Sequence, residues 1–445
     1  MTKVTFIGAG STVFARRMIT DLLMIEGIEG GEIALVDIDA ERLSLITRLA
    51  ERLVERSGKA WRICSSTERR DLLPGTDFLI NTIEVAGVAN VAHDYEIPLR
   101  YGIDQCIGDT IGPGGIFKAL RTGAVWLEIL RDCEALCPDA WVLNHTNPMS
   151  ILTLAALKGS SMRTVGLCHS VQLTSRSLAD YLGLEYDDLE WRCAGINHNA
   201  WFTHLRSHGQ DQYPRLRDLA GHLEVYEQDP VRFDMMLHFG AFVTETSGHF
   251  SEYVPYYRKR KALIERYTRP GYRGESGFYA RNWLTWRVEG DHHIGQMLTG
   301  EREIPRRRSD EYGSRIVEAM ILNRLQVIYG NVRNTGLIDN LPDGCVEVAC
   351  LVDRNGVQPC HWGPLPEQLA ALNRSHMAVH TLMVDALLNR DWEAARYALQ
   401  LDPLSAAVCS PAEIAGLFDE MWQAQEPYLS AFARPARTLV AGRRP

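Results

Sequence analysis

The sequence predicts an α/β protein in which a doubly wound parallel sheet precedes a second domain of mixed α/β structure. Up to about residue 190, short apolar runs alternate with segments whose apolar residues recur at helical spacing, and beyond it this alternation ends. The chain of 445 residues is also too long for one compact core. We therefore expect two domains, residues 1–190 and residues 191–445.

The elements of the first domain follow from the apolar runs and from the turn residues between them. We expect strands at residues 3–10, 32–39, 61–66, 76–83, 140–145 and 163–169. We expect helices at residues 12–26, 40–58, 68–73, 114–137, 147–157 and 171–183.

The second domain has a less regular pattern. Residues 191–205 indicate extended chain with a polar corner, and a region rich in Tyr, Arg and Gly follows. Residues 316–334 and 344–359 mix a helix with strands. Two helices are expected to close the chain, near residues 365–390 and 411–429.

Composition restricts the class of protein. The net charge of -9 leaves no basic excess to displace counterions from phosphates, so we expect no nucleic-acid partner. No run of 18 apolar residues is present, so we expect no membrane span. The ten cysteines form no C-x-x-C pair, and Met1 stands just before the first strand with no room for an export signal. We therefore expect reduced thiols in the cytoplasm, one of them free to bind a metal ion.

The opening segment KVTFIGAGST is typical of a strand that turns into a helix at a nucleotide site. Gly8 and Gly10 lack side chains, so the backbone there and at Ser11 can approach a pyrophosphate at the N-terminus of the helix. The third glycine of the usual fingerprint is absent, because Val13 takes its place. Asp37 ends the next strand, where its carboxylate would bind ribose hydroxyls and disfavour a 2′-phosphate. This pattern favours NAD over NADP.

Polar residues also follow later strands, at what should be the same edge of the sheet. Asn147 lies in NHTNP, and an Asn-Pro here resembles the lactate and malate dehydrogenase superfamily, whose Rossmann-like domain places an asparagine beside nicotinamide and substrate. Cys168 ends the strand at 163–169, and His198 follows the next strand, in GINHNAW. A lone cysteine after a strand is ordinarily a small buried hydrophobe. With His198, however, Cys168 would leave open positions on a divalent ion, as a catalytic metal needs.

Together these motifs resemble glycoside hydrolase family four, and most closely its melibiase (α-galactosidase) branch. The resemblance covers nearly the whole chain, in GDTIGPGGIFKALRT, LNHTNPM, VGLCHSVQ, RCAGINH, FVTETSGHFSEY, VIYGNVRN and LIDNLPDGCVEVACLVD. It implies a glycosidase that depends on NAD and on a divalent metal ion, usually Mn²⁺, and that departs from the usual two-carboxylate scheme.

The family resemblance also implies a mechanism. NAD takes hydride from C3 of the sugar, and the resulting ketone makes the C2 proton acidic enough for a side chain to remove. The aglycone then leaves by elimination, water adds, and the hydride returns to C3. The metal ion holds the C2 and C3 oxygens and stabilises enolate charge.

Roles for individual residues follow from the same resemblance. Cys168 and His198 match the metal ligands. The cofactor loop corresponds to Gly8, Gly10 and Asp37. Asn147 corresponds to a contact with both substrate and cofactor. Asp109 lies in a glycine-rich loop that resembles one lining the pocket, with loop bracing as the alternative. His169 matches a candidate general acid or a substrate contact, since imidazole can donate a proton near neutrality.

Two further roles, the base at C2 and a contact to the sugar hydroxyls, have more than one candidate or interpretation. Tyr253 is the candidate base at C2, with His249, Glu252 and Tyr256 as alternatives, and a tyrosine would need a lowered pKa for this task. Arg333 is expected to hold sugar hydroxyls or to brace its loop.

The CHSV sequence after the strand resembles branches that act on unphosphorylated hexosides. It favours α-galactosides such as melibiose, then α-glucosides. The basic run YYRKRKALIERYTRPGYR is a solvated face or a site for an anionic sugar, a uronoside or sulfoquinovoside. Two rival functions remain, an NAD-dependent hydroxy-acid dehydrogenase and an NAD-binding regulatory protein. Members of the family form homodimers or homotetramers, and we expect the same here.

Overall fold

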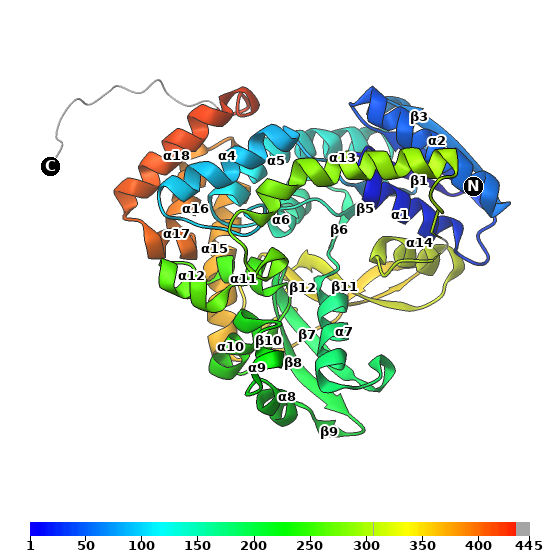
Figure 1. The fold of residues 1–445 in the computed structure, drawn as a ribbon. Coiled ribbons are helices and arrows are strands. Elements are labelled where there is room, and N and C mark those ends of the chain that lie inside the picture. The colour runs from blue at the N-terminus through cyan, green and yellow to red at the C-terminus, as the bar shows by residue number, and fades with distance from the viewer. Residues whose placement is uncertain (306, 433–445) are drawn as a thin grey trace.

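One sheet runs through the whole molecule (Figure 1). The computed structural model describes residues 1–305 and 307–432. The strands are β1 Lys3–Ile7, β2 Gly30–Val36, β3 Ala60–Ser66, β4 Phe78–Asn81, β5 Trp141–Asn144, β6 Arg163–Leu167, β7 Glu190–Ile196, β8 Asn199–Ser207, β9 Gln210–Asp211, β10 Phe242–Val243, β11 Gln326–Arg333, β12 Cys345–Asp353 and β13 Gly356–Pro359. Their order across the sheet is β10-β8-β7-β12-β11-β6-β5-β4-β1-β2-β3, with β9 and β13 paired to β8 and β12.

The helices cover both faces of this sheet. They are α1 Thr12–Leu23, α2 Ala40–Ser57, α3 Arg69–Leu72, α4 Gly87–Arg100, α5 Gly112–Leu136, α6 Met149–Gly159, α7 Ser170–Leu182, α8 Tyr213–Leu219, α9 Leu223–Tyr226, α10 Pro230–Phe239, α11 Ser247–Tyr253, α12 Lys261–Tyr267, α13 Phe278–Thr299, α14 Tyr312–Leu322, α15 Glu367–Asn389, α16 Trp392–Leu401, α17 Pro403–Val408 and α18 Pro411–Gln425. None of the helices in the described part of the chain is both long and apolar enough to span a membrane.

The six strands expected in the first domain are all present, in the parallel order β3-β2-β1-β4-β5-β6. This is the order of a doubly wound dinucleotide-binding sheet, and it confirms the predicted fold class. One helix of this half, α4, was not predicted. Its sequence GVANVAHDYEIPLR contains Pro98 and lacks a regular apolar stripe. Tertiary contacts hold it instead, because Asp94 of α4 forms a buried ion pair with Arg121 of α5, 2.6 Å between Oδ2 and Nη2.

The sheet continues into the second half of the chain without a break. β11 pairs antiparallel with β6, so that Gly330 lies opposite Leu167, and β12, β7, β8 and β10 follow. The extended chain expected at 191–205 is the hairpin of β7 and β8, whose two-residue turn is Asn197-His198. The division at residue 190 remains a prediction.

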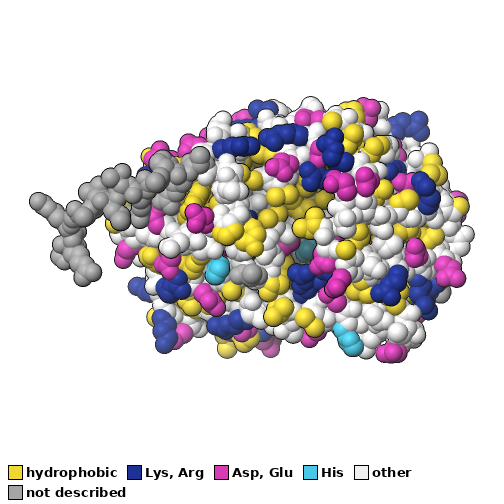
Figure 2. Space-filling view, turned by 90° about the horizontal axis from the view of Figure 1, so that it is seen from above, with side chains coloured by type: hydrophobic (Ala, Val, Ile, Leu, Met, Phe, Trp, Pro, Cys, Tyr) yellow, Lys and Arg dark blue, Asp and Glu magenta, His cyan; other side chains and the backbone are white. Residues whose placement is uncertain are grey.

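The core has two large parts, one on each face of the sheet. Helices α1, α2, α7 and α14 pack over one face, and α5, α6, α15, α16 and α18 pack over the other. The two closing helices expected in the sequence are α15 and α18, with α16 and α17 between them. The long helix α13, which the irregular pattern did not predict, lies along the nucleotide half near the top of Figure 1. The face seen from above carries interspersed positive, negative and apolar side chains (Figure 2).

Candidate active site

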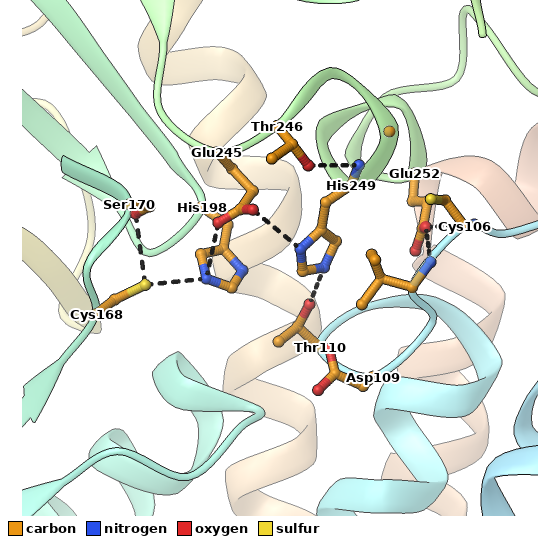
Figure 3. Close-up of polar contacts among 12 residues, drawn as sticks. Cys106, Asp109, Thr110, Cys168, Ser170, His198, Glu245, Thr246, His249 and Glu252 are labelled. Carbon is orange, nitrogen blue, oxygen red and sulfur yellow. Dashed lines mark hydrogen bonds and ion pairs between the residues drawn. The ribbon is translucent and has the colours of Figure 1, made fainter. Parts of the chain in front are cut away.

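Cys168 and His198 come together at the carboxyl edge of the parallel strands. Cys168 directly follows β6, and His198 is the second residue of the β7–β8 turn, with φ 62°. Cys168 Sγ lies 3.2 Å from His198 Nε2 (Figure 3). His198 is buried, and Cys168 is partly exposed. The structure thus joins the two residues expected to bind a metal ion.

A third candidate ligand, Glu245, was not expected from the sequence. It lies between β10 and α11, and its Oε2 is 3.3 Å from His198 Nε2. The ligand atoms of Cys168, His198 and Glu245 all lie within 4.8 Å of one another. Burial opposes ionisation of Glu245, but the site histidines lower the pKa of this carboxyl below its usual value. The residue also has φ 73°, a left-handed conformation that is uncommon for non-glycine residues.

His249 and Tyr253, both on α11, surround this cluster. His249 Nδ1 is 3.6 Å from Glu245 Oε1, and its Nε2 is 2.5 Å from Thr110 Oγ1 (Figure 3). The hydroxyl of Tyr253 lies 3.3 Å from His198 Nδ1, the ring nitrogen that faces away from Cys168. Burial raises the pKa of Tyr253 well above its usual value.

Asp109 and Asn147 form the polar wall beside the cluster. Asn147 Nδ2 lies 3.5 Å from Asp109 Oδ2, and Lys118 Nζ donates to the same oxygen at 3.2 Å. Burial opposes ionisation of Asp109, but Lys118 and the site histidines lower the pKa of this carboxyl. The other oxygen, Oδ1, is buried and has no partner among the described residues. Asp109 therefore presents a negatively charged acceptor to the site.

His169 stands at the entrance, at the N-terminus of α7. Its Nδ1 lies 3.6 Å from Oε1 of Glu311, and its side chain is 55% exposed. The interaction with the Glu311 carboxylate raises the pKa of His169 to about 9. Glu311, which also pairs with Arg17 at 3.3 Å, was not expected from the sequence.

The nucleotide turn is closely packed at its first glycine. Gly8 has φ 83°, and a Cβ there would lie 2.6 Å from the carbonyl carbon of Thr82. Ser11 precedes the first residue of α1. Asp37 follows β2, and its Oδ2 accepts a hydrogen bond from Gly10 N at 2.7 Å. All four expected cofactor-loop residues therefore lie at one end of β1 and β2.

Three residues considered from the sequence do not line the cluster. Arg333 ends β11, which runs antiparallel to β6, so it lies toward the opposite edge from Cys168, where it donates to Asp343 at 2.9 and 3.0 Å. Glu252 is buried and accepts hydrogen bonds from the backbone N–H groups of residues 106–108. Tyr256 is 37% exposed and packs against Phe239.

One signal in the sequence could have located one of the two missed carboxylates. Glu245 stands four residues before His249 in the motif FVTETSGHFSEY, at a spacing that can join two side chains. Glu311 has no local signal, because its partner His169 is distant in the chain. The assembled groups can bind a divalent ion, hold a polyhydroxylated ligand and transfer protons.

Comparisons with known proteins identify the family that this chain resembles. The model of a family described as Family 4 glycosyl hydrolase matches residues 3–184, and that of its C-terminal domain matches residues 193–405. An α-galactosidase of Bacillus subtilis (strain 168) is 42% identical over 437 residues, which cover 97% of this chain and 100% of the relative. An α-galactosidase of Rhizobium meliloti is 36% identical, with 99% and 93% covered.

More distant proteins share the fold. An α-galacturonidase of Bacillus subtilis is 30% identical, with 95% of this chain and 97% of the relative covered. The structure of a 6-phospho-α-glucosidase from gut microorganisms, in complex with NAD and Mn²⁺, has a TM-score of 0.81 and 21% identity, with 96% and 98% covered.

Proposed function

Because this chain belongs to family 4 of the glycosyl hydrolases, we propose that it hydrolyses α-galactosides with NAD and a divalent metal ion, Mn²⁺ in the first instance. The observation that carries this proposal is the convergence of Cys168, His198 and Glu245 at the same edge of the sheet as the nucleotide turn. The α-galactosidase relatives support the sugar, and the NAD and Mn²⁺ complex of a similar structure supports the cofactors.

The residues present fit both NAD and a divalent metal ion. Gly8 lets the turn after β1 pack directly against the backbone of Thr82, which places this turn at the N-terminus of α1, and Asp37 supplies the ribose acceptor. Cys168, His198 and Glu245 offer sulfur, nitrogen and oxygen, so a divalent ion held by them keeps positions open for sugar hydroxyls.

Bound NAD would supply a hydride acceptor and donor at C3 of the sugar, and the metal ion would supply positive charge near the C2 and C3 oxygens. Asp109 and Asn147 orient the sugar, since Oδ1 of Asp109 has no partner in the part of the chain that the structure describes and can accept a hydrogen bond from a sugar hydroxyl. His169 donates a proton to the leaving oxygen, and Glu311 keeps its ring protonated at neutral pH.

Tyr253 and His249 compete for the role of base at C2. Tyr253 faces the ring of His198, and its raised pKa means that it acts only if a bound cation lowers that pKa. His249 bridges Glu245 and Thr110. If the contact between its Nε2 and the hydroxyl of Thr110 is released, this nitrogen can face the sugar. In D₂O, C2 deprotonation leaves deuterium at C2 of the galactose product. Because the aglycone leaves only after this deprotonation, a variant that lacks the base forms no product. We expect Tyr253→Phe to stop the formation of deuterated galactose; continued formation with Tyr253→Phe and its loss with His249→Gln would assign the base to His249.

The side chains near the basic run favour a neutral sugar. Arg258 is buried and donates to the backbone oxygens of Asp104 and Gly274, so its charge holds a loop. Lys259 and Arg260 are exposed. An α-glucoside, an α-galacturonoside or a sulfoquinovoside is the alternative substrate, and the α-galacturonidase and α-glucosidase relatives support the first two.

The function is tested with nitrophenyl α-galactoside and dialysed protein, with NAD, Mn²⁺ and a thiol reductant each added or withheld. We expect cleavage only with all three and no accumulation of NADH, because the hydride returns to the sugar. Cleavage without NAD, or steady formation of NADH, would contradict the proposed mechanism. Faster cleavage of glucosides, uronosides or sulfo-sugars in a parallel panel would change the assigned sugar.

We further propose a cytoplasmic homodimer or homotetramer. Val327 and Leu351 are neighbours on the β11–β12 ladder, and both are exposed, at 53% and 38%. This exposed apolar pair is the surface that we propose as part of a subunit contact. Light scattering on purified protein measures the assembly, and a monomer at micromolar concentration would contradict it.

A further inference from the structure

Helix α13 lies across the nucleotide half, although it belongs to the second half of the sequence (Figure 1). It meets α1 at Gly290, where an added Cβ would lie 2.9 Å from Oγ1 of Thr12 in the first turn. It meets α2 one residue later, where Asp291 Oδ2 is 2.8 Å from Arg42 Nη1. The side chains of this ion pair are 33% and 14% exposed, so water reaches it only in part.

The same helix reaches α4. Arg287 lies 3.5 Å from Asp39, the N-cap of α2, and within 3.6 Å of where a Cβ of Gly87 would stand. Gly87 is the first residue of α4. Helix α13 therefore contacts the N-termini of α1, α2 and α4, which surround the carboxyl ends of β1, β2 and β4. In doubly wound sheets the dinucleotide binds in this crevice.

A direct link joins α13 to the nucleotide turn. Arg42, besides binding Asp291, donates from Nε and Nη2 to the carbonyl oxygen of Gly10 at 2.9 and 2.6 Å. The ion pair thus connects α13, through one side chain, to the turn expected to hold the pyrophosphate. Movement of α13 away from α2 would break this connection.

The N-terminal end of α13 is fixed beside the proposed substrate pocket. Gly277 N donates to Gln105 O at 2.8 Å, and Tyr279 N donates to Cys106 O at 3.0 Å, in the loop that leads to Asp109. The helix is therefore anchored at its N-terminus, beside the loop that leads to Asp109, and near its middle, beside the dinucleotide turn.

We propose that α13 forms the outer wall of the cofactor site and that the Arg42–Asp291 ion pair holds it closed over the adenosine half of NAD. This inference rests on the proposed function. A dehydrogenase must exchange its cofactor in every cycle, whereas this hydrolysis returns the hydride to the sugar and leaves NAD⁺ in place. A covering helix that slows the release of NAD therefore does not limit turnover.

The test measures cofactor release from the full chain with Mn²⁺ present. The protein is loaded with NADH, mixed with excess NAD, and the loss of bound NADH fluorescence gives the dissociation rate. Asp291→Asn removes the charge of the pair and keeps the shape of the side chain. Glu289→Gln is the matched control, because it removes the same charge from an exposed position of the same helix.

We expect Asp291→Asn to release NADH roughly five- to tenfold faster than the wild type, as the loss of one partly buried ion pair implies, and Glu289→Gln to change the rate less than about twofold. Gly290→Val, which wedges the helix away from Thr12, should also accelerate release. Thermal melting of each variant checks that it is folded.

Equal rates for wild type, Asp291→Asn and Gly290→Val would overturn the inference. Tighter NADH binding by Asp291→Asn would also overturn it, because α13 would then compete with the cofactor. If the wild type binds neither NAD nor NADH in calorimetry, the proposed function fails and this inference fails with it.

Discussion

Replacing Glu311 with glutamine tests whether His169 is the general acid. The interaction between the two side chains raises the pKa of His169 from 6.5 to about 9. A general acid must carry its proton, so its contribution is present below this pKa and is lost as the pH rises through it. Without the charge of Glu311 we expect the pKa of His169 to fall toward its ordinary value.

The magnitude follows from the two protonated fractions. At pH 8 a histidine with a pKa of about 9 is roughly 90% protonated, and one with a pKa of about 6.5 is roughly 3% protonated, a ratio of about 30. The His169 side chain is 55% exposed, so water screens part of the interaction. We therefore expect kcat/KM at pH 8 to fall by roughly 10- to 30-fold and to be nearly unchanged below about pH 6.

The assay compares two substrates over pH 5.5 to 10 (roughly the range in which histidine titrates here). The glucose that melibiose releases is a poor leaving group and needs a proton, whereas nitrophenolate leaves without much help. In Glu311→Gln, the alkaline limb of the plot of kcat/KM against pH should therefore move to lower pH for melibiose, and much less for nitrophenyl α-galactoside. Asp310→Asn is the control, since Asp310 is an adjacent exposed carboxylate paired with Arg176 at 3.0 Å. An unshifted limb in Glu311→Gln, or equal effects on both substrates, would refute the assignment of His169.

Three other predictions concern the metal ion, the core and the nucleotide turn. Glu245→Gln should weaken Mn²⁺ binding by about 10- to 100-fold, measured by electron paramagnetic resonance of free Mn²⁺, and unchanged affinity would exclude it as a ligand. Arg121→Ala leaves Asp94 buried and unpaired, so the free energy of unfolding in urea should fall by about 3–5 kcal/mol, against less than about 0.5 kcal/mol for the exposed Arg131→Ala. Gly8→Ala puts a methyl group into the adjacent backbone at a positive φ, and calorimetry should show lost NAD binding; normal affinity would contradict this.

The order of strands and helices in the first half was predictable because each element carries its own local pattern. The apolar runs of β1, β2, β5 and β6 are short and bounded by turns, and α2 has a regular apolar stripe. Helices α4 and α13 lack such a pattern and depend on contacts with distant segments, so the sequence did not indicate them.

For the candidate site, the sequence alone predicted that Asp37 and Cys168 lie at one edge of the sheet, because parallel strands place their carboxyl ends there. His198 follows β7, which runs antiparallel to its neighbours β12 and β8, so the tertiary structure decided that the β7–β8 turn brings it to Cys168. Tertiary structure alone decided that Glu245 and Glu311 join these residues and that Arg333 does not. These pairings depend on how far-apart segments pack against one another, and the spacing of residues along the chain does not encode that distance.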